Sequence, residues 1–164
     1  MMGKDNLARV EIRNAVADDI EALVAIRLSF LAEEFHPLSG EDIAFYSTQL
    51  REYYETHLGK EVFAVLAYHE ETVISSVFLV VDEWPGNPRI PNGRVGTILN
   101  VYTAPEWRRN GLATQLMETI IRLAKEKQVS RIRLKASASG KPLYEKVGFL
   151  EECGEYTNMV LEKL

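Results

Sequence analysis

A glycine-containing turn between an extended run and a long amphipathic run constrains this chain more than any other feature. The residues Arg108-Arg109-Asn110-Gly111-Leu112-Ala113 follow the apolar stretch Val95 to Thr103 and open a helical pattern from Gly111 to Lys127. Glycine suits such a turn because it adopts positive φ at no steric cost. The first N–H groups of the helix have no acceptor inside it, and the helix dipole favours an anion there. With two arginines beside it, the turn is predicted to hold a phosphate or, better, a diphosphate.

Residue spacing predicts the other elements of the chain. Alternation, helical stripes and turn residues indicate strands at Val10 to Asn14, Val62 to Tyr68, Val73 to Val81, Val95 to Thr103, Arg131 to Ala136, near Phe149 and Tyr156 to Leu161, and helices from Asp18, from about Glu41, from Gly111 and from Gly140 to Lys146. The order β-α-α-β-β-β-α-β-α-β-β predicts a mixed α/β fold with one central sheet. A length of 164 residues suits one domain, 1–164.

Two motifs carry a resemblance to a known family. Arg-x-x-Gly-x-Ala at Arg108 to Ala113, preceded by Pro105-Glu106-Trp107, resembles the acetyl-CoA-binding motif of the GNAT superfamily of N-acetyltransferases. Downstream, Leu143-Tyr144-Glu145-Lys146-Val147-Gly148-Phe149 is similar to the late "LYEKxGF" signature of the same family. The resemblance implies the acyl-CoA N-acyltransferase fold, with a mostly antiparallel sheet and helices on both faces.

The resemblance also implies acetyl-CoA as co-substrate, with its pyrophosphate on the loop N–H groups. In the family the fourth and fifth strands splay apart, and the pantetheine arm pairs with strand backbone in the gap. The positions that match the cofactor contacts are Val101, Tyr102, Thr103, Arg108, Arg109, Asn110, Gly111, Leu112, Ala113, Thr114 and Ser137. Many members have Asn where this chain has Ser137, and a serine hydroxyl reaches less far.

Two residues are expected to be catalytic. Tyr144 matches the family tyrosine that serves as general acid to the departing thiolate, and a phenol with a reference pKa near 10 is protonated at neutral pH. Some members carry a carboxylate on the fourth strand, where this chain has Asn100, which orients an amine or water but takes no proton. The proton of the amine then leaves through ordered water or through Glu33, Glu34 or His36.

The first two helices are expected to build the acceptor side. Between Ala17 and Leu58 there are nine carboxylates and two arginines, so an acidic rim would attract a cationic amine, although a solvated helix face explains the same charges. Four aromatic residues either line a pocket or belong to the core: Tyr46, Tyr53, Tyr54 and Trp84. The exposed last strand, Tyr156 to Leu161, would pair across a homodimer.

Composition restricts the remaining classes. A net charge of −5 argues against a nucleic-acid binder, and no apolar run approaches the length of a membrane span. The three histidines lie far apart in sequence, so no metal site is expected. A single cysteine, Cys153, forms no internal disulfide, which favours the cytoplasm.

Two functions follow from these observations. The first is an acetyl-CoA-dependent N-acetyltransferase that moves an acetyl group directly to a primary amine of a small molecule or peptide. The alternative is a non-catalytic acyl-CoA-binding or sensing module, which the absence of a carboxylate at Asn100 keeps open.

Overall fold

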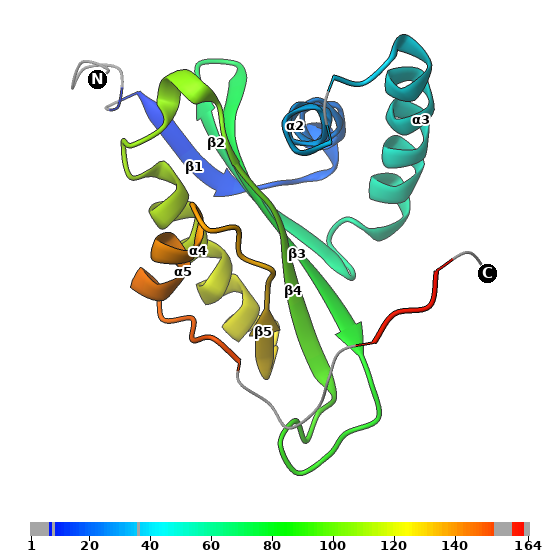
Figure 1. Ribbon diagram of the computed structural model, residues 1–164, viewed down its shortest axis with the longest axis vertical. Coiled ribbons are helices and arrows are strands. Elements are labelled where there is room, and N and C mark those ends of the chain that lie inside the picture. Colours follow the sequence, from blue (N-terminus) through cyan, green and yellow to red (C-terminus); the bar gives the residue numbers. More distant parts are fainter. Residues whose placement is uncertain (1–6, 8, 36, 153–158, 163–164) are drawn as a thin grey trace.

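The computed structural model describes residues 7, 9–35, 37–152 and 159–162, in which a five-stranded sheet carries helices on both faces (Figure 1). The strands follow the sheet in chain order: β1 (Val10–Asn14), β2 (Val62–His69), β3 (Thr72–Glu83), β4 (Arg94–Thr103) and β5 (Arg131–Arg133). The helices are η1 (Ala17–Asp19), α2 (Ile20–Glu34), α3 (Gly40–His57), η2 (Pro105–Trp107), α4 (Leu112–Glu126) and α5 (Lys141–Lys146).

The sheet is mostly antiparallel and opens at one side. Strands β1 to β4 pair antiparallel with their neighbours, whereas β5 pairs parallel with β4 only from Val95↔Arg131 to Thr97↔Arg133. Beyond Thr97, β4 continues to Thr103 with no strand partner on its β5 side among the described residues. The predicted mixed sheet is therefore confirmed, and it leaves a free strand edge beyond its last parallel pair.

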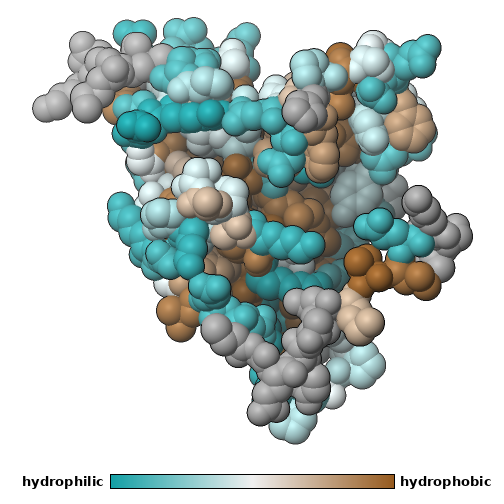
Figure 2. Space-filling model, viewed as in Figure 1, coloured by the Kyte–Doolittle hydropathy of each residue, from teal (hydrophilic) through white to brown (hydrophobic). Residues whose placement is uncertain are grey.

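Each face of the sheet has its own core. Helix α4 packs on one face through the predicted stripe, in which Leu112, Leu116, Ile120, Leu123 and Ala124 are all buried. Helices α2 and α3 pack on the other face around Leu23, Tyr54 and Phe78. Figure 2 shows hydrophobic residues gathered in the middle of the molecule, between these two sides. The sheet thus separates an α4 side, which includes α5, from an α2 side.

Polar contacts fix the entry to α2 and the start of α3. Asp19, just before α2, accepts two hydrogen bonds from Arg13 of β1, of 2.7 and 2.8 Å, and a third of 2.6 Å from the Tyr68 hydroxyl of β2. Ser39 caps α3 by accepting from the Asp42 amide at 3.1 Å. The N–H groups at a helix start lack intrahelical acceptors, so the Ser39 side chain sets the first turn of α3.

Some predicted strands are shorter than expected or lie outside the described residues. The strand expected from Arg131 to Ala136 ends at Arg133, because β4 and β5 diverge and the ladder stops. Residues 149–152 form no strand, contrary to the expectation near Phe149. Of the last expected strand, residues 156–158 lie outside the described residues and 159–161 are irregular.

Candidate acyl-CoA site

A bulge in β4 lies at the point where the sheet opens. The register with β3 shifts between Ser76 and Phe78, and Asn100 opposite this shift has φ of 52°. A non-glycine residue at positive φ is uncommon and requires support from its surroundings. Asn100 is only 3% exposed, so that support is inside the protein.

The side chain of Asn100 is held from both ends. Its Nδ2 donates to Ser76 Oγ at 2.9 Å, and its Oδ1 accepts from Arg27 Nη1 of α2 at 3.2 Å. Ser76 Oγ in turn donates to the Asn100 carbonyl at 3.3 Å. The amide predicted to orient an amine is thus buried and bound within the protein, on the α2 side of the sheet.

The loop before α4 presents a run of free backbone donors. Arg109 has φ of 63° and Gly111, the N-cap of α4, has φ of 80°. The amides from Arg109 to Thr114 make no hydrogen bond within the described part of the chain. Consecutive N–H groups at a helix start form an anion site, which is the chemistry that a diphosphate requires.

Local contacts set the shape of this loop. The Asn110 side chain donates to the carbonyls of Trp107 and Arg108 at 3.1 and 3.2 Å, which holds the loop in its turn. Trp107 is buried and anchors η2 to the α4-side core. The Cβ position of Gly111 has no neighbour closer than Gln115 Nε2 at 4.0 Å, which leaves open space for a ligand.

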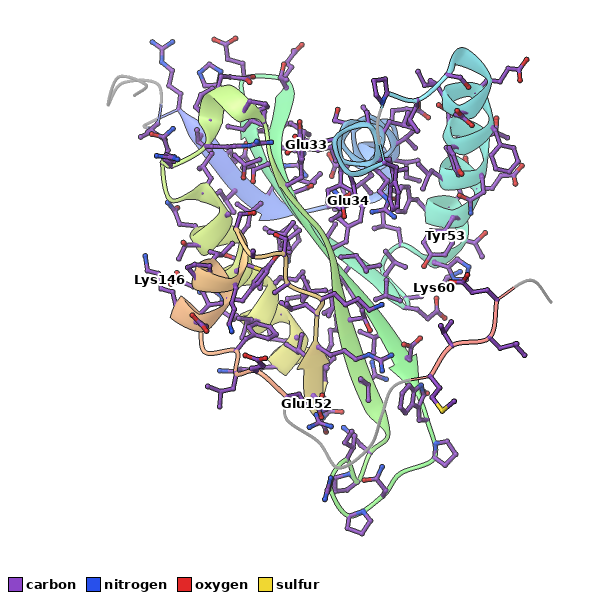
Figure 3. All side chains as sticks on the ribbon, in the orientation of Figure 1. Glu33, Glu34, Tyr53, Lys60, Lys146 and Glu152 are labelled. Atoms are coloured by element: carbon purple, nitrogen blue, oxygen red, sulfur yellow. The ribbon has the colours of Figure 1, made fainter. Side chains whose placement is uncertain are left out.

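The two arginines of the loop have different surroundings. Arg108 Nε donates to the Thr103 carbonyl at 2.8 Å, and its Nη2 lies 2.6 Å from Glu33 Oε2. Figure 3 shows Glu33 at the end of α2, on the side facing the sheet. Arg109 is exposed and makes no ion pair with the described residues. Only Arg109 is therefore an uncommitted cation beside the free amides.

Tyr144 and Ser137 lie on either side of Gly140. A methyl group added at Gly140 would lie 3.1 Å from Tyr144 Cε2 and 3.2 Å from Ser137 Oγ. Ser137 Oγ accepts from the Gly140 amide at 3.1 Å, while the Tyr144 hydroxyl has no hydrogen-bond partner in the described residues. Burial raises the pKa of Tyr144 above its usual 10. The phenol is therefore a free, protonated donor on the α4 side.

The three β4 residues expected to contact the cofactor lie near the end of the strand. Val101 packs against the α4-side core, and Tyr102 packs on the other face with the Arg108 guanidinium 5.9 Å from its ring centre. Thr103 Oγ1 is 2.8 Å from Ser75 Oγ. All three lie on the part of β4 that has no β5 partner.

Fewer than half of the carboxylates between Ala17 and Leu58 have a side-chain partner among the described residues. Four of the nine have one, namely Asp19 with Arg13, Glu21 with Arg51, Glu33 with Arg108 and Asp42 with Ser39. Of the aromatic residues, Tyr54 is a core residue, Tyr53 packs against that core, and Tyr46 and Trp84 are exposed. His36 lies outside the described residues.

Arg27 is the functional candidate that sequence reasoning missed. It lies one helical turn after Leu23 and three residues before Phe30, so it interrupts the apolar stripe of α2. A lone arginine at such a position is the signal that points to a buried polar contact.

Comparisons with known proteins agree with this geometry. The sequence matches the model of the acetyltransferase (GNAT) family over residues 26–149. A crystal structure of a predicted acetyltransferase with acetyl-CoA from Clostridium acetobutylicum is 30% identical, with a TM-score of 0.78 over 92% of this chain and 96% of that one. A GCN5-related N-acetyltransferase from Ralstonia eutropha JMP134 is 24% identical, with a TM-score of 0.73 over 92% and 98%. No curated protein matches the sequence.

More distant structures share the fold alone. An aminoglycoside acetyltransferase, meta-AAC0020, from an uncultured soil metagenomic sample is 16% identical, with a TM-score of 0.70 over 94% of this chain and 98% of that one.

The open sheet, the free-amide loop and the family match define an acyltransferase of the acyl-CoA-dependent class. The chain belongs to the acetyltransferase (GNAT) family, whose members use acetyl-CoA as co-substrate.

No helix among the described residues is both long and apolar enough to cross a bilayer. No three side chains of His, Cys, Asp or Glu gather there as metal ligands would.

Proposed function

We propose that this protein is an N-acetyltransferase that moves an acetyl group from acetyl-CoA directly to a primary amine of a small molecule or peptide. The observation that carries the proposal is the run of free amides from Arg109 to Thr114, next to the unpaired edge of β4. Coenzyme A would use both features. Its diphosphate would bind the free amides at the helix start, and its pantetheine arm would pair with the backbone of the open strand edge.

The residues present fit such a donor. The amides of the loop and the Arg109 guanidinium would hold the diphosphate, while Arg108 and the Asn110 side chain fix the loop from behind. The edge of β4 at Val101, Tyr102 and Thr103 would pair with the pantetheine amides. Ser137, exposed beside Tyr144, would donate its hydroxyl to the same arm.

The chemistry requires a neutral amine and a proton for the leaving sulfur. A bond forms from the amine nitrogen to the acyl carbon as the carbon–sulfur bond breaks, and one proton leaves the nitrogen. A free strand N–H near Val101 would stabilise the developing oxyanion. Tyr144 would give its proton to the sulfur, since its hydroxyl is free and burial keeps it protonated. The proton that leaves the nitrogen as the amide forms would then restore the phenol through water.

The ammonium proton of the acceptor leaves on the α2 side. Glu33 and Glu34 at the end of α2 are exposed carboxylates there, and Glu33 already lies at the β4 end through Arg108. Either carboxylate, or water beside it, would receive the proton. Asn100 keeps a positioning role, because its side chain is bound to Ser76 and Arg27.

Free-thiol release with acetyl-CoA and a panel of amines tests the proposal. Turnover with at least one amine, and transfer to nitrogen seen by mass spectrometry, is expected. Thermal stabilisation by acetyl-CoA without turnover on any amine would instead favour a module that binds or senses acyl-CoA.

We also propose a single domain over 1–164 and a cytoplasmic location, the latter supported by the lone Cys153.

A further inference from the structure

Arg27 is a partly buried cation without a counter-ion. It extends from α2 toward the β4 bulge, where its Nη1 donates to Asn100 Oδ1 and its guanidinium carbon lies 5.2 Å from the centre of the Phe30 ring. No carboxylate among the described residues pairs with it. Burial lowers the pKa of Arg27, which reflects the cost of removing its charge from water.

The other arginines show how unusual this arrangement is. Six of them pair with a carboxylate: Arg13, Arg51, Arg94, Arg108, Arg131 and Arg133. The described arginines without such a partner are exposed, apart from Arg27. A charge that is partly withdrawn from water is ordinarily paired, because desolvation of an unpaired ion costs free energy. An unpaired guanidinium in this place therefore indicates a partner that arrives with the substrate.

Arg27 and the neighbouring core leave polar atoms without a partner in the described residues. The buried Tyr54 of α3 belongs to the α2-side core, and its hydroxyl has no hydrogen-bond partner there. The Arg27 nitrogens other than Nη1 also lack a partner among these residues, and they are not among the buried polar atoms left without one, so solvent reaches them. A guanidinium fork with free donors matches an oxyanion with two or more oxygens.

The position of Arg27 relates this anion to the reaction. Asn100 belongs to the stretch of β4 beyond the last β5 pair, and Arg27 contacts it from the α2 side. Figure 1 shows α5, which carries Tyr144, beside α4, whose first turn carries the free amides, on the other side of the same strand. A group bound at Arg27 would therefore belong to the acceptor and not to the donor.

We propose that Arg27 binds an oxyanion of the acceptor, a carboxylate or a phosphate carried close to the reacting amine. This inference rests on the proposed function for the identity of the amine as acceptor. It assigns the acceptor to small amines that also carry a negative charge, in place of the polycationic amines that the acidic first helices suggest. Asn100 acts as a positioning residue, since its Oδ1 orients the guanidinium.

Matched acceptors separate the anion from the amine. Amino acids are compared with their carboxamides, and O-phosphoethanolamine with ethanolamine, each in thiol release and in calorimetric binding to the CoA-bound protein. The anionic member of at least one pair should be favoured at least tenfold in kcat/KM or Kd, and the pair that shows it distinguishes carboxylate from phosphate. The proposal is overturned if the anionic and the neutral acceptor have equal kcat/KM and equal Kd in both pairs.

Substitutions assign the preference to Arg27. Arg27→Met should cost about 10- to 100-fold on the preferred anionic acceptor, the worth of a charged hydrogen-bonded contact, and less than threefold on its neutral counterpart. Arg51→Met, on the exposed Glu21 pair of α3, is the control and should change neither. An equal loss on both members would show a structural role only.

A second variant keeps the proposal testable if Arg27→Met folds poorly. Asn100→Asp supplies an internal carboxylate next to Arg27, so it should remove the preference for the anion while keeping the guanidinium in place. Retention of the full preference in this variant contradicts the proposal. Calorimetry reads anion binding without turnover, so a protein that acetylates no amine but binds the anion through Arg27 contradicts the proposed function alone.

Discussion

Arg108 of the free-amide loop and Glu33 of α2 form an ion pair of 2.6 Å across the end of β4. The same guanidinium donates to the Thr103 carbonyl, so it connects the loop, the strand and the helix. The pair places the end of α2 beside the donor site, and it removes Arg108 from the positive charge offered to a phosphate.

The two loop arginines should therefore differ in their effect on the donor. Arg109→Met should raise the Kd for acetyl-CoA about tenfold at low salt, since a charge-assisted contact contributes about 1.5 kcal/mol. The difference should shrink at high ionic strength, because exposed charges are screened. Arg108→Met should change Kd less than threefold in the same titration. The opposite ranking would show that Arg108 turns from Glu33 to the phosphate.

Gly111 and Gly59 form a matched pair with φ of 80° and 81°, and an added Cβ would clash with nothing at either site. Alanine at either position should lower the free energy of unfolding by about 1 kcal/mol, the cost of a left-handed conformation. Only Gly111→Ala should weaken acetyl-CoA binding, because strain there moves the free amides. If calorimetry gave the two variants equal affinities for acetyl-CoA, the loop at Gly111 would not be the site that binds it.

Tyr144→Phe should lower kcat about 10²-fold or more, with little change in the Kd for acetyl-CoA, if the phenol supplies the proton. Burial raises the pKa of Tyr144, so the midpoint of any loss of activity from its ionisation should lie above pH 10. Tyr53→Phe is the control, since burial also raises its pKa but it packs on the α2 side. A full rate in Tyr144→Phe on the best acceptor excludes the general-acid role.

The lowered pKa of Asp19 predicts that the protein loses stability in acid. Its hydrogen bonds with Arg13 lower its pKa from 3.8 to about 2. Because the folded pKa is the lower one, the stabilisation is present above about pH 4 and disappears as the pH falls toward 2. It amounts to about 2 kcal/mol.

Urea unfolding of the wild type and Asp19→Asn at pH 7 and pH 2.5 measures this difference. The gap between the two proteins should narrow in acid. The exposed Glu21→Gln should leave the pH dependence as it is. A gap that is constant with pH contradicts the assignment.

Gly96 lies in the short parallel pairing of β4 with β5, where neighbouring side chains pack closely against it. A Cβ there would lie 2.7 Å from Leu79 Cδ1 and 3.2 Å from Val129 Cγ1, so Gly96→Val should destabilise by about 1–3 kcal/mol through overpacking. Gly40→Ala at the start of α3 meets no atom and should be neutral or slightly stabilising. Urea midpoints of the two variants make the comparison, and a neutral Gly96→Val would mean that the Leu79 and Val129 side chains move aside at no cost.

Local pattern predicted the parts of the structure that local physics determines. The stripe of α4 and the positive φ of Gly111 depend on neighbours a few residues away, and both are found as expected. The length of β5 was overestimated, because alternation continues to Ala136 while pairing depends on where β4 diverges.

The acceptor side could not be predicted from the sequence for the same physical reason. Arg27 and Asn100 are 73 residues apart, and only the packing of α2 on the sheet brings them together. The bulge that buries Asn100 depends on the register of β4 against Ser76, which no local signal specifies. The role expected for Asn100, orienting a ligand directly, assumed a free amide.

The separation of the two cores by the sheet has a kinetic consequence. The free amides and Tyr144 belong to the α4 side, whereas Arg27 belongs to the α2 side. Two substrates that approach one strand from opposite faces do not obstruct each other's entry. Initial-rate plots should therefore show intersecting lines, and each product should be able to leave by its own route without an acetylated form of the protein.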